Sequence, residues 1–441
     1  MTLNLDGFDA VRQNLTILDG NVSGWGNVNV TGNSSLLADV TFGSGGIAVN
    51  YVGASGAVVR ISSNNSFRMT GNYVNAAGLI AEIESNPAYA PLADRLVSAV
   101  YAINGAGPGL AEIALKQLIG ESLLGVSEAA SDIALKTAGA VFGRLDTIRA
   151  SSALTPPSAG SPDGLNRVWA GGFGTWARQD NRNDVFGYRY RSGGFAIGYD
   201  RSVAALDGLV LGASMAFSTG ELESSGGFSS VDIDTIGFGL YGSYTHPTGI
   251  FFDLSATFGR SDNESEIFLV TGGKKTGKFH VDTWQLAART GYVISTGSLS
   301  IVPSVGVRYL TFRQGAWNET VTGSAIPGNT FGKRSEHLVE IPAQVRITGT
   351  FSVGSARITP ELRLGYTYSA KRPDNTLRVG FAGYDGQTVI QGIRARRNTF
   401  QVGTGVKIST GSMLDVFVNY DASFASGFYE HRGSLGIGLE F

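Results

Sequence analysis

The chain has 441 residues, a formal net charge of −2 and only 16% charged residues. This balance leaves no basic surface for nucleic acid, so we expect no nucleic-acid partner. Cysteine is absent, which excludes disulfide frameworks, thiolate metal sites and cysteine nucleophiles.

No stretch reaches the ~18 consecutive apolar residues of a membrane-spanning helix, and residues 1–18 lack the layout of a secretory signal. Helices are therefore not expected to cross a bilayer. If the protein resides in an outer membrane, the missing signal predicts that these residues are the downstream part of a longer or processed chain.

Residues 1–75 are rich in Asn, Gly, Ser, Thr and Val, with short alternating stretches broken by glycine-containing turns. The pattern is similar to stacked β-solenoid rungs. Its repeats are too few and too irregular to define a period, so a small β-sandwich remains the alternative. Both alternatives predict a β-rich region outside the membrane.

Short helices are predicted in residues 76–126, where apolar residues recur at intervals of three and four. A further helix is predicted over residues 127–150, followed by a Pro- and Gly-rich breaker at residues 158–163. Its apolar positions step by three or four residues: Ala130, Ala134, Ala138, Val141, Leu145 and Ile148.

Residues 165–441 alternate between apolar and polar positions, as in Ile358, Leu362 and Tyr366 on one face against Glu361 and Arg363 on the other. Twelve candidate strands are found, an even number, as bacterial single-chain outer-membrane barrels require. They begin near Arg167, Tyr190, Gly208, Val231, Gly249, Lys278, Ser298, Arg334, Gly354, Ile393, Gly411 and Phe428.

The period alone does not say which face is inward, so a soluble barrel or sandwich has to be considered. The connections between the strands distinguish a soluble fold from a membrane barrel, because tight turns alternate with long loops near residues 221–230, 262–277, 313–333 and 370–391. Short turns on one rim and long loops on the other are typical of outer-membrane barrels. We therefore predict an all-β fold: a 12-stranded antiparallel transmembrane β-barrel with an α-helix in its pore.

The polar face then lines the lumen, where charges are tolerated. A twelve-stranded pore admits one helix about 10 Å across, and residues 127–150 are the expected plug. Arg144 and Arg149 are expected either to pair with lumenal carboxylates such as Glu361 or Asp415 or to make rim contacts in water. The predicted pore-lining residues are Arg289, Arg308, Glu340, Arg346, Glu361, Arg363, Lys407, Asp415 and Asp421, and the predicted pore-helix residues are Ala138, Val141, Arg144, Leu145, Ile148 and Arg149.

Aromatic residues near strand ends are expected to form interfacial girdles, with scattered core aromatics as the alternative. The candidates are Trp169, Trp176, Tyr309, Phe312, Tyr366 and Tyr368.

Three stretches together resemble the classical autotransporters of type V secretion. They are residues 114–122 (Ala-Leu-Lys-Gln-Leu-Ile-Gly-Glu-Ser), residues 142–146 (Phe-Gly-Arg-Leu-Asp) and the terminal Gly-Leu-Glu-Phe. Residues 114–122 look like the Ala-Leu-x-Gln-Leu-x-Gly-Glu stretch that often precedes the translocator in that family. The resemblance covers the whole chain, because the β-rich stub, the helix and the barrel follow in the family's order.

The resemblance implies a translocator in the outer membrane of a Gram-negative bacterium, which exports its own N-terminal passenger to the cell surface and anchors it. Residues 1–75 would be the end of the passenger, 76–126 a helical connection, 127–164 the pore helix and linker, and 165–441 the barrel. The implied partners are outer-membrane lipid, the barrel assembly machinery and the passenger, with a monomeric barrel. The implied signal for that machinery is Leu435, Ile437, Leu439 and Phe441.

One departure from the family concerns passenger release by cyclisation, which uses an Asn pair in the helix. Residues 127–150 contain no Asn, so this cleavage is not expected. A surface adhesin whose β stub binds a partner and a diffusion porin are the alternative functions.

The short motifs that could indicate a nucleotide-binding or metal-binding site lack the structural context that such sites require. Residues 237–242 satisfy G-x-G-x-x-G but lie within a predicted strand, and the histidines are too far apart for a metal motif. Lumenal carboxylates could form a catalytic pair, but charge lining a pore is the simpler interpretation. We therefore predict no enzyme activity, no catalytic, cofactor-binding or metal-binding residue, and no cofactor.

Overall fold

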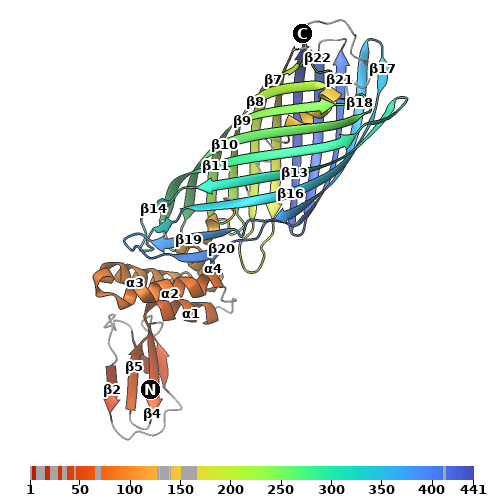
Figure 1. The fold of residues 1–441 in the computed structure, drawn as a ribbon. Coiled ribbons are helices and arrows are strands. Elements are labelled where there is room, and N and C mark those ends of the chain that lie inside the picture. Colours follow the sequence, from red (N-terminus) through yellow and green to blue (C-terminus); the bar gives the residue numbers. More distant parts are fainter. Residues whose placement is uncertain are drawn as a thin grey trace.

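The computed structural model describes residues 2–5, 15–19, 28–31, 37–43, 46–64, 71–126, 129, 139, 141–149, 166–410 and 414–441. The molecule is elongated, with a small β stub at the N-terminal end, a layer of helices and a slanted barrel (Figure 1). The helices lie between the stub and one rim of the barrel, and the C-terminus lies at the other rim (Figure 1).

The barrel is closed and antiparallel, and the prediction of twelve spanning strands is confirmed. The last strand pairs with the first from Phe428↔Gln179 to Glu440↔Arg167, so no strand edge is left open. The twelve strands are β6 (Asn166–Gln179), β7 (Tyr188–Ser202), β8 (Leu209–Ser224), β9 (Ser229–Thr245), β10 (Ile250–Phe268), β11 (Lys274–Tyr292), β13 (Leu299–Gln314), β16 (Arg334–Gly349), β18 (Ala356–Lys371), β21 (Asn398–Thr410), β22 (Leu414–Ala425) and β23 (Phe428–Glu440).

The two rims of the barrel differ as predicted, but two of the four predicted long loops are short. Residues 225–228 connect β8 to β9 and residues 269–273 connect β10 to β11, because these strands extend through most of the predicted loops at 221–230 and 262–277. Short connections join the strands at the rim where β6 begins and β23 ends, and this rim carries β12 (Ile294–Thr296) and β17 (Phe351–Val353). The opposite rim carries the long loops, which form β14 (Trp317–Thr322), β15 (Asn329–Phe331), β19 (Thr376–Phe381) and β20 (Thr388–Gln391). We call these the short-turn rim and the long-loop rim.

The faces of the barrel exchange polarity along its length. Near the short-turn rim, β10 turns Leu254 outward, where it is 63% exposed, and Asp253 inward, where it is buried. Beyond Phe258 the outward residues become charged, as in Asp262, and the inward Ile267 is buried. Neighbouring strands change in the same way, with outward Asp232, Asp234, Lys278 and His280 and inward Val231, Ile233, Phe279 and Val281.

This exchange marks the edge of the membrane. A wall that faces lipid is apolar outside, whereas a wall that faces water must be polar outside and bury its apolar side chains. The long-loop end of β8–β11 therefore projects from the bilayer, and it buries apolar residues such as Ile267 beside the polar Ser261, Asn263 and Ser265 of β10. The helical layer packs against this end, because one buried apolar cluster joins Leu96, Leu118 and Leu123 to Phe279 and Phe331.

The helical layer consists of α1 (Gly53–Asn64), α2 (Gly71–Ser85), η3 (Pro87–Tyr89), α3 (Ala90–Gly105), α4 (Pro108–Leu118) and η4 (Glu121–Leu123). The predicted boundary at residue 76 is wrong for residues 53–64, which are helical rather than β. Ala54, Ala57, Val58 and Ile61 are buried at helical spacing on α1. Gly and Ser between them obscure that period in the sequence.

The β stub ends at Tyr51. β1 (Thr2–Asn4) and β3 (Asn29–Thr31) pair in parallel, as solenoid rungs do, whereas β2 (Leu15–Asp19), β5 (Gly46–Tyr51) and β4 (Ala38–Gly43) form an antiparallel sheet. The assignment of this stub as the end of a passenger solenoid stays a prediction.

Residues 141–149 are helical and lie inside the barrel. Apart from residues 129 and 139, the rest of the predicted helix 127–150, Ala138 included, lies outside the described residues. Within the described ranges no helix combines the length and the apolar character that crossing a membrane requires.

Candidate functional site

The pore helix, residues 141–149, packs against the wall formed by β7–β11. Val141, Leu145 and Ile148 are buried in a cluster with Val210 of β8 and Tyr241 of β9. These apolar contacts orient the helix, so its two arginines face the same wall.

Arg144 is held by a buried carboxylate of β7. Its Nε donates to Asp200 Oδ2 at 2.9 Å, and both side chains are almost fully buried. The Tyr241 hydroxyl also donates to Asp200 at 3.2 Å, and Trp169 Nε1 donates to the Tyr241 hydroxyl at 2.8 Å. Arg144 also lies close to β23, since a Cβ added at Gly438 would stand 2.8 Å from its Nη1.

Arg149 belongs to a four-membered charge cluster. Its guanidinium bonds to Asp253 at 2.6 and 2.9 Å and to Asp146 at 2.7 Å. Arg289 of β11 bonds to the same two carboxylates, at 2.6 Å to Asp253 and 2.8 Å to Asp146. Arg346 of β16 approaches the same cluster, 3.9 Å from Asp146. Two carboxylates therefore hold Arg149 and Arg289 in a buried site, where removing one carboxylate leaves positive charge uncompensated.

The ion-pair partners named in the prediction for Arg144 and Arg149 are wrong. Neither Glu361 nor Asp415 is paired with Arg144 or Arg149 among the ion pairs of the described residues, which assign Asp200 and Asp253 instead. The helix packs against β7–β11, whereas Glu361 and Asp415 lie on β18 and β22, where they pair with Arg346 and Lys407. The alternation of Phe252 and Leu254 with Asp253 puts Asp253 on the polar face of its strand, but it does not say which carboxylates the helix contacts.

Eight of the nine predicted pore-lining residues line the lumenal cavity, and the ninth, Asp415, is paired with Lys407 of that lining. Three of them reach the helix: Arg289 through the charge cluster, Arg346 Nη2 at 3.1 Å from the Asp146 carbonyl, and Lys407 Nζ at 3.3 Å from the Thr147 carbonyl. Residues of this set also pair with one another, within β18 as Arg363–Glu361 and between strands as Arg308–Glu340 at 2.8 Å, Arg346–Glu361 at 3.6 Å, Arg363–Asp421 at 2.9 Å and Lys407–Asp415 at 3.7 Å.

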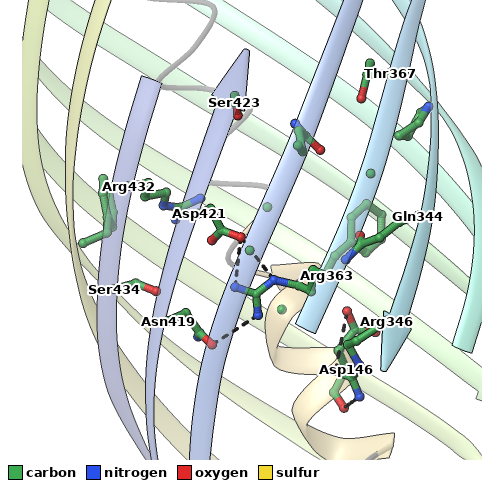
Figure 2. A pocket seen from close by; sticks show the side chains of 18 of the residues that line it. Asp146, Gln344, Arg346, Arg363, Thr367, Asn419, Asp421, Ser423, Arg432 and Ser434 are labelled. Atoms are coloured by element: carbon green, nitrogen blue, oxygen red, sulfur yellow. Dashed lines mark hydrogen bonds and ion pairs between the residues drawn. The ribbon is translucent and has the colours of Figure 1, made fainter. Parts of the chain in front are cut away.

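A cavity of 360 Å³ remains beside the helix. On its wall, Arg363 of β18 reaches over β21 to Asp421 and Asn419 of β22, and Arg346 points toward Asp146 of the helix (Figure 2). The helix therefore occupies the β7–β11 side of the lumen, and a polar space is left on the β13–β23 side.

The aromatic girdle is only partly as predicted. Tyr309 and Tyr366 are exposed on the outside of the barrel, whereas Trp169 and Phe312 are buried inside it. A strand reverses the direction of its side chains at each residue, so proximity to a strand end does not decide the face.

The predicted assembly signal lies on the outer face of β23. Leu435, Ile437, Leu439 and Phe441 are exposed, with Phe441 at 65%. Phe441 also closes the barrel, because its backbone N–H donates to the Asn166 carbonyl at 2.9 Å. Recognition of this strand by an assembly machinery stays a prediction.

Comparisons with known proteins agree with this architecture. Residues 168–421 match the model of the autotransporter beta-domain family. Outer membrane protein B of Rickettsia prowazekii (strain Madrid E) is 23% identical over 332 residues, covering 69% of this chain and 20% of that protein. Outer membrane protein A of Rickettsia conorii (strain ATCC VR-613 / Malish 7) is 24% identical over 321 residues, covering 68% and 15%.

This chain spans a fifth or less of the length of those two relatives. Among solved structures, the translocator domain of the autotransporter NalP from Neisseria meningitidis has a similar fold, with a TM-score of 0.52 and 15% identity over 69% of this chain and 98% of that one. The family match over more than half of the chain and the closed twelve-stranded barrel confirm the expected resemblance: the chain belongs to the autotransporter beta-domain family and is an outer-membrane translocator.

Proposed function

We propose that the barrel exports the passenger to which its own N-terminal end is joined and then anchors that passenger at the cell surface. One observation carries the proposal: the chain threads its own pore. The helices up to Val126 lie at the long-loop rim, residues 141–149 lie in the lumen, and β6 begins at Asn166 on the short-turn rim. This is the arrangement that export from the short-turn side would leave behind.

The lining supports passage of an unfolded segment. A chain in transit needs partners for its backbone N–H and C=O groups, which lipid does not supply. Arg346 and Lys407 already donate to backbone carbonyls of the helix at 3.1 and 3.3 Å. The nine pore-lining residues would serve a passing chain in the same way, without covalent chemistry.

We further propose that the barrel is not itself an enzyme. The lumenal carboxylates Glu340, Glu361 and Asp421 each form an ion pair with an arginine, which suits a structural lining better than acid–base catalysis. A diffusion porin is not favoured either, because the helix is fastened in the pore by buried ion pairs.

The proposed partners are outer-membrane lipid on the apolar outer band, the barrel assembly machinery on β23, and the passenger. Residues 1–75 would be the end of that passenger, with its β part ending at Tyr51. Deleting Phe441 removes one outward aromatic side chain and two backbone hydrogen bonds to Asn166. We expect this deletion to reduce the amount of folded barrel in the outer membrane.

Protease shaving of intact cells tests the function. The full chain is expressed behind a secretory signal, with one epitope before Thr2 and another in the turn at residues 204–207. External protease should remove the first epitope and spare the second, because the short-turn rim faces the periplasm. Protection of the N-terminal epitope in intact cells with a folded barrel would refute surface display.

A further inference from the structure

A short polar segment of the helical layer, residues 116–121, contacts barrel residues at the long-loop rim, and we call it the latch segment. It joins α4 to η4 and lies within the resemblance to the Ala-Leu-x-Gln-Leu-x-Gly-Glu stretch. Its polar side chains Lys116, Gln117 and Glu121 are each 1–2% exposed. Polar groups this deeply buried are stable only when their hydrogen bonds are made.

The side-chain amide of Gln117 pairs with backbone groups of the connection between β10 and β11, as a backbone amide would in a strand pair. Its Nε2 donates to the Phe268 carbonyl at 2.8 Å, and its Oε1 accepts from the Val270 N–H at 3.1 Å. Both ends of the amide are used, so α4 is held in one register against this hairpin.

The end of α4 is capped by two barrel residues. Lys275 Nζ of β11 donates to the Gln117 carbonyl at 2.8 Å, and Asn329 Nδ2 of β15 donates to the Leu118 carbonyl at 2.9 Å. A cation at this position also complements the negative end of the helix dipole. Lys275 is itself fixed by Asn329 Oδ1 at 2.5 Å and by Glu319 at 3.4 Å, and the side chains of Lys275 and Glu319 are fully buried.

Lys116 and Glu121 extend the contact to two further loops. Lys116 Nζ donates to the Asp184 carbonyl at 2.5 Å and lies 3.6 Å from the ring centroid of Phe186, both in the β6–β7 connection. Glu121 accepts from Asn72 Nδ2 at 3.0 Å, and the Asn72 amide pairs with the backbone of Gln391 in β20.

Apolar packing fills the space between these polar contacts. Phe279, Trp317 and Phe331 form a stack with ring centroids 4.6 and 4.1 Å apart. Gly120 lies against it in a left-handed conformation (φ +69°), where an added Cβ would stand 2.8 Å from the Phe331 ring. A larger residue at position 120 would therefore strain both the backbone and this contact.

We propose that the latch segment closes the outer mouth of the pore against ions and small solutes, as a second barrier in series with the helix 141–149. Loops β6–β7 and β10–β11 and strand β15 contact the latch segment directly, and the β18–β21 connection contacts it through Asn72, an arrangement that would leave no water-filled path between them. The described lining of the lumenal cavity reaches Phe428 at the long-loop rim and includes no residue of 71–126. The proposal rests on the proposed function only in taking the lumen of the barrel as the export pore.

Conductance of the purified full chain in planar lipid bilayers separates the two barriers. Lys116→Leu with Gln117→Leu opens the latch, and Asp253→Asn releases the inner helix. Two barriers in series predict low conductance for either change alone. The combination should open about tenfold more often than Asp253→Asn, because several buried hydrogen bonds of the latch are lost.

Arg95→Leu, on the exposed side of α3, is the matched control and should leave conductance unchanged in both backgrounds. Heat-modifiable gel mobility shows that each barrel is folded. If Asp253→Asn alone conducts as freely as the combination, or if the combination stays closed, the latch is not a barrier.

A second measurement does not depend on how well the latch variant folds. The chain has no cysteine, so Ser122→Cys (8% exposed) and Ser85→Cys (exposed on α2) are unique reporters. A membrane-impermeant maleimide on intact cells should label position 85 at least tenfold faster than position 122. Equal labelling would overturn the proposal, whereas a barrel that fails to display its N-terminal epitope would overturn the proposed function instead.

Discussion

The charge cluster that fastens the pore helix makes Asp253→Asn the most informative substitution. Asp253 is 1% exposed and accepts hydrogen bonds from both arginines of the cluster and from the Ser243 hydroxyl at 2.6 Å. The neutral amide leaves Arg149 and Arg289 facing the single carboxylate of Asp146, which Arg346 also approaches. Removing one member of a buried ion pair costs about 3–5 kcal/mol, which is roughly a 10²- to 10⁴-fold rise in the unseated population of the helix.

Thiol labelling measures that population. Gly143 faces the cavity, and an added Cβ there meets nothing within 4 Å, so Gly143→Cys is a benign reporter in a chain without other cysteines. A maleimide joined to a polymer too large for the 360 Å³ cavity reacts only when the helix leaves its seat. In detergent, Asp253→Asn should therefore raise the labelling rate about 10²- to 10⁴-fold.

Asp421→Asn is the matched control, because Asp421 bonds to Arg363 of the barrel and neither residue has a hydrogen bond or ion pair with helix 141–149 among the described contacts. Its labelling rate should stay within about threefold of the parent's, since a partly exposed pair contributes little. A parental rate in Asp253→Asn would mean that the apolar contacts alone seat the helix. A double-mutant cycle with Arg149→Met then measures the coupling, which should exceed about 1 kcal/mol for residues in one network.

Two further predictions concern other parts of the molecule. Leu254→Lys, in the middle of the outward apolar run of β10, should destabilise the folded barrel by about 2–4 kcal/mol, whereas Thr219→Lys, outward on β8 beyond the apolar band, should change it by less than about 0.5 kcal/mol. Urea unfolding in lipid vesicles measures both, and equal effects would contradict the assigned membrane edge. Burial raises the pKa of the Glu121 carboxyl, so its contribution to stability is present below the ordinary carboxyl range and is lost as the pH rises through the raised value. Glu121→Gln should therefore flatten the pH dependence of helical-layer melting by circular dichroism between acid and neutral pH, and an unchanged slope would contradict this assignment.

Much of the barrel could be predicted from the sequence because each strand residue meets only one of two environments. The alternation of apolar and polar residues is read locally, and the predicted strand starts at Arg334 and Phe428 coincide with those of β16 and β23. The same reasoning put the lumenal charges on the inner face. It also predicted a helix for the pore, where residues 141–149 are helical.

Other features depend on contacts between distant segments, and only the tertiary structure decided them. The position of the pore helix makes Asp200 and Asp253, rather than Glu361 and Asp415, the ion-pair partners of its arginines. All four are lumenal carboxylates at alternating positions, so the sequence pattern does not distinguish them. The helix 53–64 is stabilised by burial against other helices. Its Gly- and Ser-rich sequence does not predict this burial. Lys116, Gln117 and Glu121 look like ordinary exposed helix residues until the barrel loops close around them. A local pattern specifies which environment a side chain prefers, but the closure of the barrel and the docking of the helices determine which partner it meets there.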